Sequence, residues 1–295
     1  INRQKTLHYL RKNNFDLFIS SYYNPYFLNK LHNKPFVVTV FDMIHEIFPA
    51  YFSGEDPLKK NKQLLCESSS RIVAISASTK KDILNLYPTI PEEKVKVIHL
   101  SQSINTREIV PLEWLPKKYV LFIGKREIYK QFDSLLKAMI PVFETDETIK
   151  IVCAGGGSFT DAEMENIKSL QLSGRIIQRS FYDNELNTIY KNAAVFVFPS
   201  EYEGFGIPAL EAMVCGCPVI LSNTSSLPEI AGDAALYFEP NNINELSAAI
   251  FKILQDENFT QSLIKKGYEQ VKKFSWDKMT NDYLETAKEI LNSKK

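Results

Sequence analysis

The sequence has few residues of the kinds that bind structural metals or form disulfide frameworks. Cysteine and histidine each occur four times among 295 residues. Cys215 and Cys217 flank a single glycine, and neither a second cysteine pair nor nearby histidines complete the four ligands that zinc requires. We therefore expect all four cysteines to be small buried thiols, and we expect no metal site.

The chain also has no excess of charge and no long apolar run. Lysine plus arginine and aspartate plus glutamate both total 35, and the basic residues are scattered rather than gathered in a stripe. Nothing in this pattern would attract nucleic acid. No segment approaches the roughly 18 to 20 apolar residues that cross a bilayer, and no secretory signal opens the chain. These absences predict a cytoplasmic globular protein, with peripheral contact at the inner face of a membrane left open.

What the sequence does contain is an alternation of short apolar segments with amphipathic helical stretches. Such alternation is typical of parallel sheets with crossover helices, and the 44% apolar content is enough for two cores. Folds of this kind bind ligands at the loops that follow the carboxyl ends of the strands. Strands are expected at residues 17–20, 36–41, 71–75, 95–100, 119–124, 149–154, 176–179, 195–198, 219–222 and 236–238.

The pattern divides the chain into two domains. Apolar periodicity lapses near residues 105–115, where prolines flank a polar stretch, so a linker is expected there. We predict a fold of class α/β, with two doubly wound parallel-sheet domains facing across a cleft. Near the C-terminus, apolar residues step by three or four from Trp276 to Ile290 behind a capping Ser275, which predicts a docked helix.

The most informative run is P-S-E-Y-E-G-F-G-I-P-A-L-E, at residues 199–211. An apolar strand leads into it, its glycines permit backbone geometry closed to other residues, and its second proline suits the first turn of a helix. The N–H groups at the start of that helix favour a phosphate, while Glu203 and Glu211 can accept hydrogen bonds from hydroxyl groups. Phosphate together with hydroxyls suggests a nucleotide sugar.

These residues resemble the E-x7-E motif of the retaining glycosyltransferases of family 4, which have the two-domain, Rossmann-like GT-B fold. Other runs resemble that family in order and spacing: A-M-V-C-G-C-P-V-I, S-S-L-P-E-I-A-G-D-A-A-L-Y-F-E-P and F-S-W downstream, and G-K-R-E-I-Y-K-Q-F-D-S-L-L upstream. The resemblance extends over about residues 36–276. It implies that residues 1–110 form an acceptor-side domain joined by the helix at 276–295, and that residues 111–275 bind the nucleotide sugar.

The resemblance also implies roles at the donor site, residue by residue. Arg126 and Lys130 would hold the pyrophosphate, because a fork-shaped guanidinium and a point-charge ammonium suit a diphosphate. Glu203 would lie beside the donor sugar and stabilise positive charge at the anomeric carbon, and Glu211 would accept the ribose hydroxyls. The remaining donor-binding residues, whose main-chain groups would meet sugar hydroxyls or phosphate, are Gly204, Phe205, Gly206 and Ile207.

On the N-terminal side, residues 38–49 resemble a family strand that usually ends in His-Asp. Phe41 occupies the histidine position here, so either Asp42 or His45 would take the acceptor-side polar role. Only about four strands precede the linker, the family's opening glycine-rich loop is missing, and the first residue is Ile1 rather than methionine. We therefore expect an incomplete N-terminal domain.

Two further features have competing interpretations. Residues 154–158, A-G-G-G-S, follow a strand but lack the P-loop ending and the full dinucleotide spacing, so we interpret them as a flexible strand-end turn lining the same cleft. The aromatic cluster at residues 22–26 could stack on a sugar acceptor, but we interpret it as packed against the core.

With the resemblance, the sequence predicts an enzyme that moves a hexose-type sugar from a UDP- or GDP-sugar to an acceptor hydroxyl, with retention and without metal or cofactor. Its partners would be the nucleotide sugar and a glycan or lipid-linked acceptor, in bacterial cell-surface polysaccharide or glycolipid assembly. Two alternatives stay open. One is an inactive nucleotide-sugar-binding module or truncated fragment, and the other is a phosphorylase or epimerase on the same fold.

Overall fold

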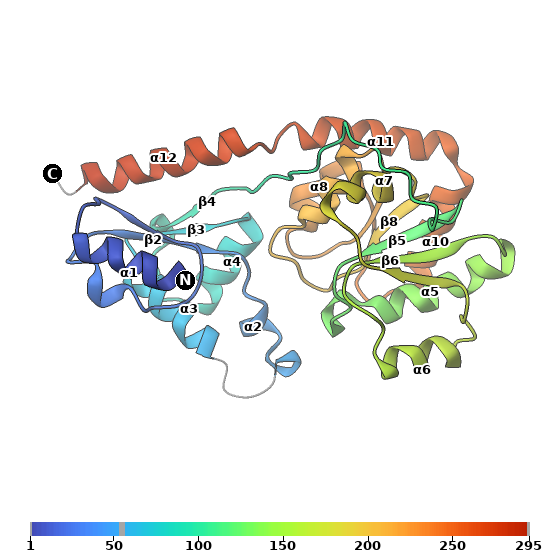
Figure 1. The fold of residues 1–295 in the computed structure, drawn as a ribbon, viewed down its shortest axis with the longest axis horizontal. Helices are drawn as coiled ribbons and strands as arrows, with labels where there is room; N and C mark the ends of the chain where they lie inside the picture. The colour runs from blue at the N-terminus through green and yellow to red at the C-terminus, as the bar shows by residue number, and fades with distance from the viewer. Residues whose placement is uncertain (1, 53–56, 294–295) are drawn as a thin grey trace. The chain divides into compact units, whose positions relative to one another are not determined.

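The computed structural model describes residues 2–52 and 57–293. The chain divides into two compact units, of which the first comprises residues 1–100 with 275–295 and the second comprises residues 101–274. Each unit is built of helices around a parallel sheet (Figure 1).

The first unit has a four-stranded parallel sheet in the order β1-β2-β3-β4. Every residue of β2 is buried, as expected for a parallel strand that is covered on both faces. The strands are β1 (Phe18–Ser20), β2 (Phe36–Val40), β3 (Arg71–Ala74) and β4 (Val95–Val97), and the helices are α1 (Asn2–Lys12), α2 (Ile44–Ile47), α3 (Pro57–Ser68), α4 (Ala77–Leu86) and α12 (Trp276–Asn292).

Alternate residues of β2 point to different helices of the first unit. Val38 packs in one cluster with Leu65 of α3 and Ile83 of α4, and Val37 packs in another with Ile290 of α12. Successive side chains of a strand point to opposite faces, so α12 covers the face opposite to α3 and α4 (Figure 1). Burial on both faces accounts for the unbroken apolar sequence of this strand.

The second unit has a six-stranded parallel sheet in the order β10-β9-β8-β5-β6-β7. The strands are β5 (Tyr119–Ile123), β6 (Lys150–Ala154), β7 (Ile176–Arg179), β8 (Val195–Phe198), β9 (Val219–Ser222) and β10 (Leu236–Phe238). The helices are α5 (Phe132–Thr145), α6 (Asp161–Ser169), α7 (Leu186–Lys191), α8 (Ile207–Val214), α9 (Leu227–Ala231), α10 (Ile243–Gln255) and α11 (Glu257–Val271).

Both faces of this second sheet are covered by helices. Val120 and Phe122 of β5 pack in a cluster with α5 and α10, and Tyr119 and Leu121 pack in a second cluster with α7, α8 and α9. Helices on both faces of a parallel sheet make a doubly wound arrangement. The predicted fold class, two parallel-sheet α/β domains, is confirmed.

The order of the strands reverses between β5 and β8. From β5 the chain builds outward to β6 and β7, and from β8 it builds the other way to β9 and β10. In open parallel sheets, ligands bind beyond the carboxyl ends of the strands at such a reversal. The loops that follow Ile123 and Phe198 therefore border the expected ligand site of this unit.

Residues 101–110 group with the second unit, whereas the resemblance implied that this unit begins at residue 111. The backbone N–H of Val110 donates to Thr188 Oγ1 at 3.0 Å. The Asn187 side chain donates to the carbonyl oxygens of Thr106 at 3.1 Å and Glu108 at 2.6 Å. These bonds to α7 attach to the second unit a segment that lacks apolar periodicity of its own.

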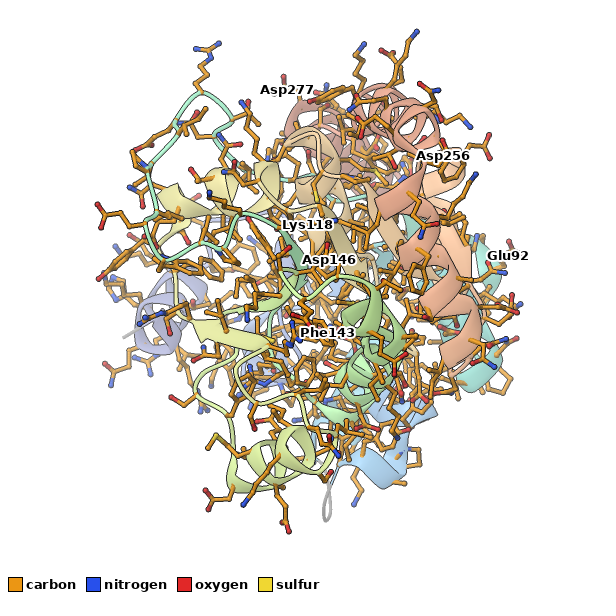
Figure 2. All side chains as sticks on the ribbon, turned by 90° about the vertical axis from the view of Figure 1, so that its right-hand side faces the viewer. Glu92, Lys118, Phe143, Asp146, Asp256 and Asp277 are labelled. Carbon is orange, nitrogen blue, oxygen red and sulfur yellow. The ribbon has the colours of Figure 1, made fainter. Side chains whose placement is uncertain are left out.

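An ion pair lies at the amino-terminal edge of the second sheet, before β5 and β6. Lys118 Nζ donates to Asp146 Oδ2 at 2.8 Å, and Figure 2 shows the two residues close together. Thr148 donates to Asp146 Oδ1 through its backbone N–H at 2.9 Å and its hydroxyl at 2.6 Å. The hydrogen bonds from Lys118 and Thr148 hold the pKa of Asp146 well below its usual range.

Candidate functional site

The turn between β8 and α8 has a backbone that only glycine adopts readily. Gly206 precedes α8 with φ of 104°, and a Cβ placed there would lie 2.9 Å from Leu227 Cδ2. The Ser226 hydroxyl lies 2.8 Å from the carbonyl oxygen of Glu203 and 2.9 Å from that of Phe205. Glu203 therefore lies in a fixed turn that leads to the start of α8. Ser226, which holds this turn, was not identified from the sequence.

Lys130 and Glu203 meet at the point where the strand order reverses. Lys130 ends a short 3-10 helix, η4 (Ile128–Lys130), in the loop after β5, and Glu203 follows β8. Lys130 Nζ lies 2.5 Å from Glu203 Oε1, with 16% and 14% of the two side chains exposed. The sequence placed both residues at one site, and the structure brings them together.

The surroundings of Lys130 hold its ammonium in place without enclosing it. Its Nζ lies 5.0 Å from the ring centre of Tyr129 and 5.1 Å from that of Phe198, both within cation–π range. The backbone N–H of Glu201 donates to the carbonyl oxygen of Tyr129 at 2.8 Å, which joins the two loops. A partly exposed cation at this edge can exchange its carboxylate partner for an anionic ligand.

Glu211 is half-buried inside α8, and a buried tyrosine holds it. The Tyr190 hydroxyl of α7 donates to Glu211 Oε2 at 2.9 Å. Burial raises the pKa of Glu211, the hydrogen bond from Tyr190 opposes that rise, and the nearby Asp183 adds to it. Tyr190 was not identified from the sequence, because its contact joins two helices that are separated along the chain.

The Arg126 side chain contacts Glu163 rather than Glu203. Its side chain is 3% exposed, and its Nε donates to Glu163 Oε1 of α6 at 2.6 Å. The expectation that Arg126 and Lys130 both hold one pyrophosphate stays a prediction, and in this conformation the two cations contact different carboxylates. The reason is Glu163, a partner 37 residues further along the chain.

The glycine run after β6 is held by Arg126. Gly155, Gly156 and Gly157 have φ values of 79°, 73° and 77°, which explains the need for three glycines. The carbonyl oxygens of Gly157 and Ser158 accept hydrogen bonds from Arg126 Nη2 at 2.9 Å and 3.0 Å. The run was interpreted as a flexible strand-end turn, and the structure shows it hydrogen-bonded to a buried arginine.

The remaining donor-side residues are within the same turn and helix start. Gly204 and Gly206 lie between Glu203 and α8, and Ile207 is the first residue of α8. The Phe205 ring is buried at 3% exposure and packs edge-on against Phe274, with 5.9 Å between ring centres. A role for Phe205 in binding would therefore involve its main chain rather than its ring.

Asp42 and His45 lie in the first unit, after β2 and in α2. Asp42 Oδ1 accepts from the backbone N–H of Ile44 at 3.2 Å, and it lies 3.9 Å from Nζ of the buried Lys62. The His45 ring stacks on Phe52, with centres 3.8 Å apart and an interplanar angle of 17°. The two candidates thus have different surroundings, one polar and charged and the other aromatic.

The four cysteines lie inside the protein. All four cysteines are buried and unpaired, as the sequence predicted, and burial raises the pKa of Cys66 and of Cys215 to about 12. Within residues 2–52 and 57–293, no three His, Cys, Asp or Glu side chains are grouped to hold a metal ion.

In the same ranges, no helix is both long enough and apolar enough to cross a membrane.

Comparison with solved structures identifies the fold. The chain superimposes on Anabaena Alr3699/HepE in complex with UDP and glucose with a TM-score of 0.80 at 18% identity, covering 97% of this chain and 80% of that one. Sucrose-phosphate synthase from Thermosynechococcus elongatus gives a TM-score of 0.79 at 21% identity, covering 98% and 77%. At these identities the likeness shows the GT-B fold alone.

Comparison with curated proteins gives closer sequence matches. O-antigen chain mannosyltransferase B of Escherichia coli is 32% identical over 244 residues, which cover 78% of this chain and 64% of the relative. The uncharacterized glycosyltransferase MJ1607 of Methanocaldococcus jannaschii is 30% identical over 238 residues, which cover 75% of this chain and 60% of the relative. The chain thus spans less than two thirds of the length of these relatives.

Two family descriptions match the chain, one in each part. Glycosyltransferase Family 4 matches residues 2–100, and Glycosyl transferases group 1 matches residues 107–270. The second match contains Lys130, Glu203 and Glu211. Because it also spans more than half of the chain, the protein belongs to the Glycosyl transferases group 1 family.

Proposed function

We propose that the chain transfers a hexose-type sugar from a nucleoside diphosphate sugar to an acceptor hydroxyl, with retention at the anomeric carbon. The observation that carries this proposal is the pair of Lys130 and Glu203 at the strand-order reversal, beside the start of α8. A cation suits the diphosphate, a carboxylate suits the sugar, and the site lies where parallel sheets bind nucleotides.

Lys130 is proposed to bind the diphosphate of the donor. Without a ligand its ammonium pairs with Glu203 at 2.5 Å, and a bound diphosphate would offer it a stronger partner of higher charge. The N-terminal end of α8 adds the positive potential of the helix dipole. Together they would stabilise the negative charge that develops on the leaving group, which is commonly the largest contribution to catalysis.

Glu203 is proposed to face the donor sugar once Lys130 turns to the phosphate. Its carboxylate would accept a hydrogen bond from a sugar hydroxyl and stabilise positive charge at the anomeric carbon. The acceptor oxygen would bond to that carbon on the face from which the diphosphate departs, while the bond from carbon to phosphate oxygen breaks. The proton of the acceptor hydroxyl would pass to the departing phosphate oxygen, so charge and atoms balance.

Glu211 is proposed to bind the ribose hydroxyls of the nucleotide. Tyr190 donates to its Oε2, which fixes the carboxylate, and the other carboxylate oxygen would accept from the ribose. The main-chain groups of Gly204, Phe205, Gly206 and Ile207 would line the sugar and the phosphate beside it. Asp42 and His45 of the first unit are the proposed acceptor-side groups.

The substrates are proposed from the relatives. Two groups of curated relatives, O-antigen chain mannosyltransferase B and the serotype-specific mannosyltransferases WbdA, carry mannose transfer in their names. GDP-mannose is therefore the first donor to test, with UDP-sugars second because the HepE structures hold UDP. We propose a glycan or lipid-linked acceptor in the assembly of a cell-surface polysaccharide, and transfer that needs no metal ion.

The proposal is tested by incubating the chain with GDP-mannose, UDP-glucose and UDP-N-acetylglucosamine, each with simple glycoside acceptors and a metal chelator. Transfer from one donor, with the anomeric configuration of the product matching that of the donor by NMR, is the expected result. An inverted product would contradict retention, and loss of activity with the chelator would contradict metal independence. Donor binding without transfer to any acceptor would instead support a donor-binding module.

A further inference from the structure

The side chain of Arg126, in the second unit, is hydrogen-bonded to several groups of the protein itself. Arg126 follows β5 by three residues and lies four residues before Lys130. Its Nε donates to Glu163 Oε1 at 2.6 Å, and its Nη2 donates to the carbonyl oxygens of Gly157 at 2.9 Å and Ser158 at 3.0 Å. These bonds use three of the five N–H groups of the guanidinium.

One of the two remaining N–H groups and one face of the guanidinium also contact protein groups. Arg126 Nη1 lies 3.4 Å from the carbonyl oxygen of Gly155. The carbon at the centre of the guanidinium lies 4.7 Å from the centre of the Phe159 ring, within cation–π range. With 3% of its side chain exposed, Arg126 has little surface left for a ligand.

Glu163 links this arginine to the start of α6. Its Oε2 accepts from the backbone N–H of Thr160 at 2.7 Å, while the Thr160 hydroxyl accepts from the backbone N–H of Glu163 at 3.2 Å, which makes a capping box. Burial opposes ionisation of Glu163, but the hydrogen bonds from Arg126 and Thr160 outweigh it and hold its pKa below the usual value. One carboxylate thus both caps a helix and fixes the arginine.

The loops after β5 and β6 touch at this arginine. A Cβ on Gly156 would lie 2.3 Å from the carbonyl oxygen of Gly124 and 2.8 Å from Arg126 Nη1, so the two backbones approach as closely as glycine allows. Since β5 and β6 are parallel neighbours, both loops lie at the carboxyl edge of the sheet. Arg126 therefore joins the loop that carries Lys130 to the glycine turn at residues 155–158.

We propose that Arg126 is a positioning residue, which with Glu163 clamps the glycine turn against the loop after β5 and so fixes Lys130, and that it does not itself bind the diphosphate. The inference rests on the proposed function for the role of Lys130. Moving Arg126 onto a phosphate would break its hydrogen bonds to the Glu163 carboxylate and to two carbonyl oxygens, and the bond to the carboxylate is of the strong, charge-assisted kind.

The test measures two quantities on the 295-residue chain: calorimetric binding of UDP and of GDP, and amide hydrogen exchange at residues 124–131 and 155–158. The variants are Arg126→Gln, Glu163→Gln, the double variant and Arg126→Lys. Arg175→Gln is the matched control, because Arg175 also lies over a phenylalanine ring, 5.5 Å from the centre of Phe143, and donates to a backbone carbonyl at the opposite edge of the sheet. Thermal midpoints show that each variant is folded.

If Arg126 and Glu163 together clamp the two loops, Arg126→Gln and Glu163→Gln should behave alike. Each should speed exchange in both loops and weaken binding of the diphosphate by about fivefold or more, and the double variant should match the singles because both remove one interaction. Arg126→Lys should do no better than Arg126→Gln, since lysine keeps the charge but loses the fork. Arg175→Gln should bind and exchange like the parent.

Two results would overturn the inference. If Glu163→Gln binds the diphosphate as tightly as the parent while Arg126→Gln does not, the guanidinium is a ligand rather than a clamp. If exchange in both loops is unchanged in both single variants, no clamp exists, whatever the affinities are. A parent that binds neither nucleotide would contradict the proposed function, and the exchange measurement would still decide the clamp.

Discussion

Lys130 and Glu203 form a short ion pair, 2.5 Å between Nζ and Oε1, although 72 residues separate them in sequence. The doubly wound topology makes the contact, because each residue follows one of the two strands between which the strand order reverses. Only 16% and 14% of the two side chains are exposed. Because the pair lies at the edge where parallel sheets bind ligands, we propose that it serves the binding of a charged ligand.

The first prediction concerns this pair. Lys130→Ala and Glu203→Gln should each lower the transfer rate by about 100-fold or more, because preorganised charge at the reacting centre is lost. Lys137→Ala is the matched control, since Lys137 pairs with Asp133 at 2.6 Å with both side chains nearly half exposed. It should transfer at the parental rate. Rates within about threefold of the parent for both site variants would show that the pair is not catalytic.

The second prediction concerns Tyr190 and the pH dependence of donor binding. Burial raises the pKa of Glu211 and donation from Tyr190 lowers it, so Tyr190→Phe should raise that pKa further. A protonated Glu211 accepts ribose hydroxyls poorly, so affinity is lost as the pH falls through this pKa. In Tyr190→Phe the loss should begin at a higher pH, with binding about three- to tenfold weaker near neutrality.

The charged and titratable groups around Glu211 include Tyr190 on α7, Asp183 in the segment before it and Cys215 just beyond α8. Tyr237→Phe is the control, because the Tyr237 hydroxyl also donates to one partner, the carbonyl oxygen of Gly232 at 2.6 Å. Its binding curve should follow the parent at every pH. Identical pH profiles for Tyr190→Phe and the parent would remove Tyr190 from the site.

The third prediction concerns the turn that leads into α8. Gly206→Ala should destabilise the chain by about 1–2 kcal/mol from its positive φ alone, and further because the new Cβ would lie 2.9 Å from Leu227 Cδ2. Gly174→Ala separates the two effects, since Gly174 has φ of 78° and open space around its Cβ position. Urea unfolding should show the larger loss for Gly206→Ala. Equal losses would mean that Leu227 moves aside at no cost.

The fourth prediction concerns the ion pair of Lys118 and Asp146. The pKa of Asp146 is lower in the folded chain than its unfolded value of about 3.9, so the pair stabilises the fold above that pH and ceases to do so as the pH falls through the folded value. Asp146→Asn should cost up to about 1 kcal/mol at pH 7, because both side chains are partly exposed.

Urea unfolding at a series of pH values checks this prediction. The difference between Asp146→Asn and the parent should shrink in acid, and it should also shrink at high salt because the charges are near the surface. A difference that stays constant down to the lowest pH at which the parent is folded would show that hydrogen bonds made by either side chain, rather than the charge, are responsible.

Much of the fold could be predicted from the sequence, because parallel strands buried on both faces are short unbroken apolar runs. Residues 195–198 and 219–222 were predicted as strands and are β8 and β9. Strand ends were harder to place: β4 was expected to continue to residue 100 but ends at Val97. The sequence pattern could not show that residues 101–110 are attached to the second unit, because that attachment depends on Asn187, a partner far along the chain.

The candidate site was predicted in part. Glu203 and the glycine turn could be found because a strand, two glycines and a proline are consecutive in sequence. The direction of the Arg126 side chain could not be predicted. It is set by Glu163 and by the carbonyl oxygens of a turn, and the positions of these groups depend on the folded backbone. Tyr190 was missed for the same reason, because its contact with Glu211 joins two helices that are separated along the chain.

The central claim is that this chain binds a nucleoside diphosphate through Lys130. The most direct measurement is calorimetric titration of the parent chain and of Lys130→Ala with UDP and with GDP, in the presence of a metal chelator. The account predicts that the parent binds one of the two nucleotides and that Lys130→Ala binds it at least about tenfold more weakly. A parent that binds neither, or a Lys130→Ala chain that binds as tightly as the parent, would contradict the account.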